Sequence, residues 1–304
     1  MLPSAPQRIV AIHDLSCLGR CALTVILPTL SVMGYQAVPL PTALLSTHTG
    51  GFEKLHFHDL TEDMGHIANH FDRLGMSFSS IYTGFLGSGA QIQTVSDFIR
   101  RFSAVPDERG KRPLVLVDPV MGDDGVLYST YNQELVDGMR ALSRHADVLT
   151  PNLTEACLLT DTPYTETSIC PREVAVKLAG QLLDKLSLLT SHRIVITGIR
   201  LCDNTLLNMG KDEDGSRFCV ITPECGCNYP GTGDIFASVL LGFLLATDSF
   251  ALACRHAAEY CAMLIRESVS IPSAVRYGVA LEPHLTELAA LLLAEKEKKE
   301  RNAL

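Results

Sequence analysis

A glycine-rich turn with one acidic residue is the part of the sequence that could most clearly do chemistry. Residues 228–234 read Asn-Tyr-Pro-Gly-Thr-Gly-Asp and run directly into an apolar stretch, residues 235–246, that is typical of a buried helix. Gly231 and Gly233 allow a tight turn, and consecutive N–H groups at a helix N-terminus can bind an anion. Asp234 would then accept the proton of a hydroxyl that attacks an incoming phosphoryl group. The alternative is structural, because Gly-Thr-Gly-Asp also suits a plain helix cap.

Carboxylates at two expected strand ends form a second group. Asp118 closes a strand at residues 113–118, and Thr-Pro-Asn-Leu-Thr-Glu at residues 150–155 follows the next strand and starts a helix. Mg²⁺ prefers oxygen ligands and usually reaches a protein through one or two carboxylates, often by way of water, plus substrate phosphates. Asp118 and Glu155 can supply those carboxylates. The structural alternatives are a plain turn after Asp118 and a capping box, because Asn152 and Glu155 have that spacing.

Other motifs of this kind are weaker. No Gly-x-x-x-x-Gly-Lys-Ser/Thr loop occurs, and the match of residues 231–237 to a dinucleotide fingerprint stands alone after a hairpin. His66 and His70 lie one helical turn apart and could hold zinc, but the glutamate of His-Glu-x-x-His is absent. A zinc hydrolase therefore remains an alternative, and surface histidines are the simpler interpretation.

The elements that must position these residues alternate along the chain. Apolar β-branched runs predict strands at residues 8–13, 36–40, 80–83, 113–118, 147–150 and 193–197. Helical spacing predicts helices at residues 20–33, 59–74, 91–102, 133–142, 152–159, 172–189, 232–246, 250–266 and 283–301. This order predicts an α/β three-layer sandwich, a mostly parallel sheet with helices on both faces. Residues 205–209 and 217–222 flank an Asp-Gly turn and predict a small antiparallel hairpin at one edge.

The composition excludes several classes of protein. With 47% hydrophobic and 19% charged residues among 304, the chain is not disordered, and a net charge of −9 disfavours nucleic-acid binding. No apolar run approaches the roughly 20 residues that a membrane span needs, and no signal peptide is evident. The 10 cysteines lack a paired framework. Without repeats or linkers, we expect a single domain over residues 1–304, soluble and cytoplasmic, with no nucleic-acid or membrane partner.

Six motifs, taken in order and spacing, make the chain resemble the ribokinase superfamily. Within it the chain is similar to the vitamin-kinase branch of pyridoxal/pyridoxamine kinases and hydroxymethylpyrimidine kinases. The motifs lie at residues 9–14, 44–51, 82–88, 117–122, 150–155 and 231–234. The resemblance implies a ribokinase-like fold, use of ATP and Mg²⁺, and phosphoryl transfer to a primary alcohol. It also implies a homodimer without a large lid, because no strand-rich insertion follows the first strands, and it leaves a monovalent-cation requirement open.

The resemblance also implies roles for individual residues. Asp234 is the expected base, and Gly231, Thr232 and Gly233 form its anion hole. Asp118 and Glu155 are expected to serve Mg²⁺ and ATP. Further nucleotide contacts are expected at Thr150, Asn152, Thr197 and Gly198, and vitamer contacts at Asp14, Ser46, Thr49 and Gly50.

Two positions depart from the family pattern. Many pyridoxal kinases have serine where this chain has Asp14. A carboxylate accepts hydrogen bonds and so favours a ring hydroxyl, an amine or a protonated pyridine nitrogen. Some relatives have lysine where this chain has Gly198, so Arg200 or Mg²⁺ would have to compensate.

The expected activity is therefore ATP-dependent phosphorylation of the 5′-hydroxymethyl group of a B6 vitamer in B6 salvage. The candidate substrates are pyridoxamine, pyridoxal and pyridoxine. The alternatives are a hydroxymethylpyrimidine kinase of thiamine synthesis and a catalytically silent protein that binds a vitamin or a nucleotide.

Overall fold

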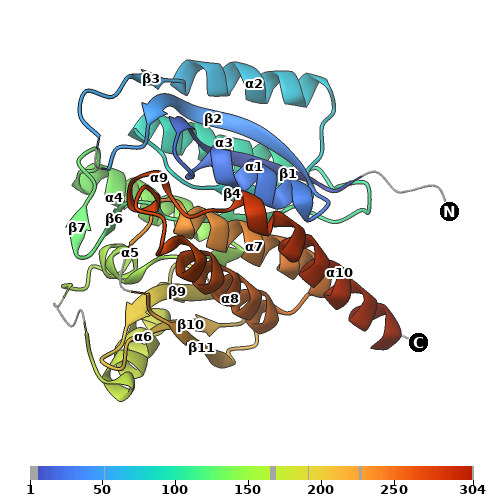
Figure 1. Cartoon of the computed structure of the whole chain (residues 1–304). Helices are drawn as coiled ribbons and strands as arrows, with labels where there is room; N and C mark the ends of the chain where they lie inside the picture. Colours follow the sequence, from blue (N-terminus) through green and yellow to red (C-terminus); the bar gives the residue numbers. More distant parts are fainter. Residues whose placement is uncertain (1–5, 51, 165–168, 191, 226–227, 303–304) are drawn as a thin grey trace.

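The computed structural model describes residues 6–50, 52–164, 169–190, 192–225 and 228–302. The strands of its main sheet are β1 (Arg8–Leu18), β2 (Gln36–Thr47), β3 (Phe57–Asp59), β4 (Ser80–Thr83), β5 (Leu114–Val117), β8 (Val148–Leu149), β9 (Arg193–Arg200), β10 (Thr205–Lys211) and β11 (Arg217–Pro223). They are ordered β11-β10-β9-β8-β5-β4-β1-β2-β3, and Figure 1 shows the two edge strands, β11 and β3, at opposite ends of the molecule. Two further short strands, β6 (Gly122–Asp123) and β7 (Val126–Leu127), form a separate hairpin.

The inner strands from β9 to β2 pair in parallel, whereas β10, β11 and β3 pair antiparallel at the two edges. The predicted parallel sheet and the predicted hairpin at one edge are thereby confirmed. The β3 edge and the β6–β7 hairpin were not predicted, because strands this short carry too few residues to show a period. β1 and β2 also continue well past their predicted ends, and this extension decides which side chains reach the site.

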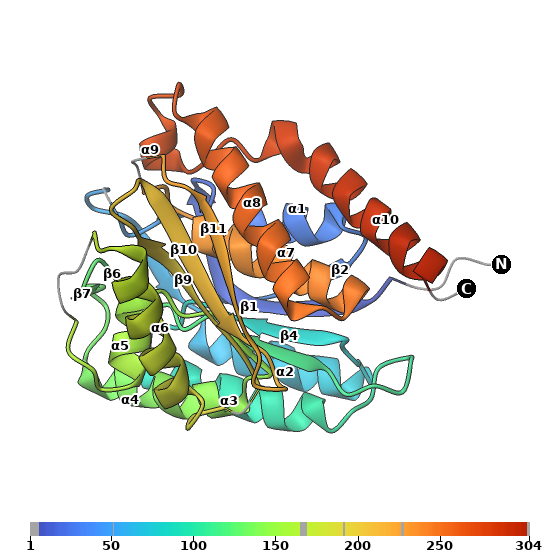
Figure 2. The same ribbon diagram turned by 90° about the horizontal axis from the view of Figure 1, so that it is seen from below.

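Helices cover both faces of the sheet. Their bounds are α1 (Leu23–Val32), α2 (Thr61–Arg73), α3 (Gly89–Ser103), α4 (Gln133–Leu142), α5 (Leu153–Leu159), α6 (Arg172–Leu186), α7 (Thr232–Thr247), α8 (Phe250–Ser268), α9 (Ala274–Tyr277) and α10 (Leu285–Asn302), with 3₁₀ turns at Ser143–His145 and Glu282–His284. Helices α2 to α6 lie on one side, and α1, α7, α8 and α10 lie on the other (Figure 2).

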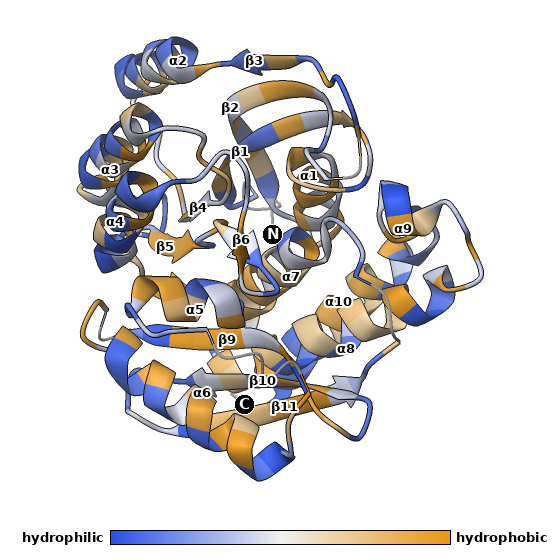
Figure 3. Cartoon of the chain, turned by 90° about the vertical axis from the view of Figure 1, so that its left-hand side faces the viewer, coloured by the Kyte–Doolittle hydropathy of each residue, from blue (hydrophilic) through white to orange (hydrophobic). Residues whose placement is uncertain are grey.

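Burial on both faces explains why the central strands read as unbroken apolar runs. In β1, Val10 and Ile12 pack into the core under α2 to α6, while Ile9 and Ala11 pack into the core under α7. Covering helices such as α3 and α4 carry both hydrophobic and hydrophilic residues (Figure 3), as a helix with one buried face should. In the described part of the chain, no helix has the length and apolarity that crossing a bilayer requires.

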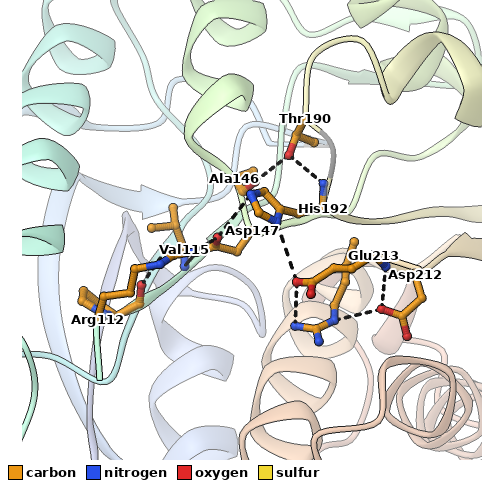
Figure 4. Close-up of polar contacts among 10 residues, drawn as sticks. Arg112, Val115, Ala146, Asp147, Thr190, His192, Asp212 and Glu213 are labelled. Atoms are coloured by element: carbon orange, nitrogen blue, oxygen red, sulfur yellow. Dashed lines mark hydrogen bonds and ion pairs between the residues drawn. The ribbon is translucent and has the colours of Figure 1, made fainter. Parts of the chain in front are cut away.

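An ion-pair network ties the amino ends of β5, β8 and β9 to the β10–β11 turn (Figure 4). Arg112 donates two hydrogen bonds, of 2.8 and 2.6 Å, to the buried carboxylate of Asp147. His192 lies between Asp147 and Glu213, at 3.9 and 3.7 Å, and Arg193 pairs with Glu213 at 3.3 Å. The network holds the β10–β11 hairpin against the sheet at the amino ends of the parallel strands, away from their carboxyl ends.

Candidate active site

A cleft of about 990 Å³ lies at the carboxyl ends of the parallel strands, where ligands bind in open α/β sheets. The predicted site residues that line it are Asp14, Thr49, Gly50, Asp118, Thr150, Asn152, Glu155, Thr197, Gly198, Gly231, Thr232, Gly233 and Asp234. Ser46 is not brought to the cleft. Successive residues of a strand point to opposite faces, so Leu45 faces the cleft and the Ser46 hydroxyl accepts a hydrogen bond from His56 N–H at 2.9 Å.

The N-terminus of α7 opens toward the cleft. Gly231 caps the helix with a φ of 82°, and a Cβ at this position would lie 2.0 Å from the carbonyl oxygen of Arg20. Only glycine fits there. A Cβ on Gly233 would meet nothing within 4 Å, so the space in front of this residue is open. Because the first N–H groups of a helix have no partner inside it, this terminus can bind an anion.

Asp234 faces the cleft and is held at both oxygens. Its Oδ2 accepts a hydrogen bond from Ala22 N–H at 2.7 Å, and its Oδ1 lies 2.9 Å from His13 Nε2. Ala22 has a φ of 53° and a ψ of −140°, a backbone conformation that costs a non-glycine residue about 1–3 kcal/mol. That strain aims the Ala22 N–H at the carboxylate. The geometry expected of a fixed base is therefore present.

His13, which sequence reasoning missed, is buried between two carboxylates. Its Nδ1 lies 2.8 Å from Asp14 Oδ1 while its Nε2 faces Asp234. Burial lowers the pKa of His13, but the charge of Asp234 and the hydrogen bond to Asp14 outweigh it and raise this pKa to about 10. His13 is therefore an imidazolium at neutral pH. In that form Nδ1–H donates to the Asp14 carboxylate at 2.8 Å. The Asp14 backbone N–H also points at Nδ1, at 2.9 Å, and this second hydrogen bond forms only when Nδ1 carries no proton.

Asp118 presents one oxygen to the cleft. Its Oδ1 accepts a hydrogen bond from the Thr150 hydroxyl at 3.0 Å, and no described residue donates to its Oδ2. Burial, and then the negative charge of Asp234, raise the pKa of Asp118 to about 7. A carboxylate in this position is ready to bind a cation.

Glu155 is held by backbone groups. Its two oxygens accept hydrogen bonds from the N–H groups of Met121 at 3.1 Å and of Asn152 at 2.8 Å, and the Asn152 side chain caps α5 in return. The capping-box interpretation is therefore confirmed. Burial and the charge of Asp118 raise the pKa of Glu155 well above its usual value. Glu155 also lines the cleft, so its role in capping α5 is compatible with a role in binding a ligand.

The cleft is strongly acidic. Its carboxylates are Asp14, Asp118, Asp123, Asp124, Glu155, Glu224 and Asp234, and its Arg and Lys residues are Arg200 and Arg276. A polyphosphate needs added cations to enter such a cleft. No described cluster of three or more His, Cys, Asp or Glu side chains forms a ready-made metal site, so the zinc alternative gains no support. Oxygen ligands from one or two carboxylates fit Mg²⁺ that arrives with phosphates.

Arg200 and the β2–β3 loop border the cleft. Arg200 lies 3.0 Å from Glu224 and 3.6 Å from Asp124, so in this structure it pairs with neighbouring acids. The loop that carries Thr49 and Gly50 is held against the segment after α8. There His48 Nε2 lies 2.8 Å from the Arg276 carbonyl oxygen.

A helix N-terminus, a carboxylate fixed at both oxygens and a second carboxylate with one open oxygen therefore lie together at the carboxyl ends of the mostly parallel sheet of this ribokinase-like fold. The family model described as phosphomethylpyrimidine kinase matches residues 26–277. The chain belongs to the phosphomethylpyrimidine kinase family, and it is an ATP-dependent kinase, as predicted.

Relatives include pyridoxal kinases. The chain is 28% identical over 255 residues to a pyridoxal kinase of Arabidopsis thaliana, covering 80% of this chain and 75% of that protein. A Bacteroides thetaiotaomicron protein described as a phosphomethylpyrimidine kinase, solved with pyridoxal, is 39% identical with a TM-score of 0.84, covering 93% of this chain and 96% of that one. Pyridoxal kinase from Lactobacillus plantarum is 31% identical with a TM-score of 0.82, covering 94% and 97%.

Proposed function

We propose that this kinase transfers the γ-phosphoryl group of ATP to the 5′-hydroxymethyl group of a B6 vitamer, in B6 salvage. The observation that carries the proposal is Asp234, fixed by His13 and Ala22 beside the open N-terminus of α7. The pyridoxal kinases among the relatives, and the Bacteroides structure with pyridoxal, support the choice of alcohol.

In this proposal Asp234 orients the 5′-hydroxyl and accepts its proton. Each Asp234 oxygen has one partner among the described residues. A carboxylate oxygen can accept a second hydrogen bond, so the alcohol can still donate to it. The N–H groups of residues 231–233 stabilise the negative charge on the transferring phosphoryl group. The reaction therefore needs little movement of the protein at the reacting atoms.

Mg²⁺ would be held by Asp118, through its open Oδ2, and by Glu155 through water, because both Glu155 oxygens already accept backbone hydrogen bonds. When bound, the ion would neutralise phosphate charge in this acidic cleft. The nucleotide would lie along the carboxyl ends of β8 and β9. The residues proposed to contact it are Thr150, Asn152, Thr197 and Gly198.

The vitamer would lie on the β1 and β2 side of the cleft. We propose contacts with Asp14, Thr49 and Gly50, which line it, and leave out Ser46, which bonds to the β3 segment instead. The Asp14 carboxylate accepts from His13 and from the Ser16 hydroxyl at 2.9 Å. It therefore presents negative charge to a ring hydroxyl, an amine or a protonated pyridine nitrogen.

A panel of alcohols tests this proposal. ADP release is measured with pyridoxal, pyridoxamine, pyridoxine and hydroxymethylpyrimidine, and the products are identified by mass. The proposal predicts turnover with a B6 vitamer at a higher kcat/KM than with the pyrimidine. The matching family model favours hydroxymethylpyrimidine kinase as the second candidate, which predicts the reverse order. No ADP release with any of these alcohols would indicate a silent binding protein.

We also propose a cytoplasmic homodimer. The nine described cysteines that are free thiols support a reducing compartment. The proposal of a dimer rests on the family resemblance. Light scattering on the protein as it elutes from a sizing column gives the mass of the assembly directly.

A further inference from the structure

His13 joins the two sides of the proposed reaction centre. This residue is only 4% exposed, and its ring lies between Asp14, on the proposed vitamer side, and Asp234, the proposed base. The Ser16 hydroxyl donates to the other oxygen of Asp14 at 2.9 Å. Ser16, Asp14, His13 and Asp234 are therefore linked in one continuous chain by two hydrogen bonds and one ion pair.

A glycine beside the ring leaves the space that it occupies. Gly84 follows β4, and a Cβ at this position would lie 2.0 Å from His13 Cδ2 and 2.3 Å from Nε2. The ring therefore lies directly against the Gly84 backbone. Burying a charged imidazolium is costly unless it is paired, and the carboxylates on either side of His13 provide that pairing.

We propose that His13 is a positioning residue that couples the vitamer subsite to the base. Its Nε2 side holds Asp234 toward the 5′-hydroxyl, and its Nδ1 side holds Asp14 toward the vitamer ring. This inference rests on the proposed function. During transfer the alcohol O–H bond breaks and its proton goes to Asp234. The alcohol oxygen bonds to the γ-phosphorus, and the bond to the β-phosphate oxygen breaks with its electron pair leaving on ADP. His13 keeps its own protons throughout.

Two amide variants separate the two contacts of His13. The side-chain NH₂ of glutamine reaches as far from Cα as Nε2 does, so His13→Gln keeps a donor for Asp234 and loses the donor for Asp14. The shorter NH₂ of asparagine matches Nδ1, so His13→Asn keeps the Asp14 contact and loses the Asp234 contact.

The two variants should change different kinetic parameters. His13→Gln should keep kcat within about threefold and raise the vitamer KM about three- to tenfold, the value of one hydrogen bond. His13→Asn should lower kcat about tenfold to a hundredfold, with the vitamer KM within about twofold, because the base is misplaced. The KM for ATP should stay near the wild-type value in both. A merely structural role would instead lower the thermal stability and kcat of both variants alike, without exchanging the kcat and KM effects.

A second test displaces the ring and leaves its chemistry intact. Gly84→Ala places a methyl group against the His13 ring and should lower kcat about tenfold or more. Gly89→Ala is the matched control, because its new Cβ meets nothing within 4 Å, and it should behave as wild type.

The outcomes distinguish this inference from the proposed function. If the wild-type protein phosphorylates no B6 vitamer, the proposed function fails. If it does so but the Gln and Asn variants change the same kinetic parameter, or neither changes any, the positioning role of His13 is overturned. Wild-type kcat in Gly84→Ala would overturn it as well.

Discussion

Replacing Asp118 with asparagine should stabilise the metal-free protein at pH 8 and, if Asp118 holds Mg²⁺ as proposed, remove turnover with ATP and Mg²⁺. Burial and the charge of Asp234 raise the pKa of Asp118 to about 7, whereas an aspartate in the unfolded chain titrates near 3.9. Asparagine keeps an oxygen for the Thr150 hydroxyl, which donates to Asp118 at 3.0 Å. The substitution therefore removes little except the charge.

The magnitude follows from proton linkage. Below about pH 4, Asp118 is protonated in both the native and the unfolded chain, so its charge costs nothing. Between about pH 4 and 7 the unfolded chain loses this proton while the native protein retains it, so stability falls as pH rises. Above about pH 7 the full cost is present. A rise of the pKa from near 3.9 to about 7 costs at most about 4 kcal/mol of unfolding free energy, and we expect a cost on the order of 1–4 kcal/mol.

The assay is thermal unfolding with a metal chelator present, at pH 5 and pH 8. At pH 8 Asp118→Asn should raise Tm by several degrees, and at pH 5 the stability gain should shrink to about a third. Asp63→Asn, at an exposed position in α2, is the control and should change little at either pH. A gain of equal size at both pH values, or a loss at pH 8, would refute the reasoning.

Two other sites give further predictions. Gly231→Ala should destabilise the fold by about 2–4 kcal/mol in denaturant unfolding, because its Cβ would lie 2.0 Å from the Arg20 carbonyl oxygen, and wild-type stability would contradict this. Gly233→Ala should keep the fold, but its methyl group enters the open anion site, so kcat/KM for ATP should fall about tenfold; an unchanged value would count against that site. Arg112→Ala should cost about 1–3 kcal/mol by removing the two hydrogen bonds to buried Asp147, with steady-state kinetics unchanged, and a shifted KM would show that the network reaches the cleft.

The layers of the fold were predictable because buried parallel strands read as apolar runs and covering helices read as periodic ones. The short strands at the edge of the sheet and in the separate hairpin were harder to predict. β3 has three exposed residues, and the strands of the β6–β7 hairpin have two residues each, too few for any period to emerge.

Much of the site was predictable because its residues lie in short local motifs at strand ends and at the start of α7. Ser46 was predicted to contact the vitamer but does not line the cleft, because β2 continues to Thr47 and its alternation turns Leu45 to the cleft instead. The contacts that fix Asp234 could not be read from sequence. The Ala22 N–H lies 212 residues away from Asp234 along the chain, and a backbone donor leaves no side-chain signature. His13 had a signal, its position beside Asp14 at the predicted end of the first strand, but its second partner depends on the tertiary fold.

The most direct test of the account is the turnover of Asp234→Asn with ATP and a B6 vitamer. Asparagine can still accept the Ala22 N–H but cannot take the proton of the 5′-hydroxyl, so kcat should fall about a hundredfold to ten-thousandfold. ADP binding should remain close to wild type, whereas Tm should fall, because asparagine has a single acceptor oxygen for the two donors Ala22 N–H and His13 Nε2–H and no longer pairs with the His13 charge. Turnover near the wild-type rate would mean that Asp234 is not the base, and the proposed reaction at this cleft would lose its basis.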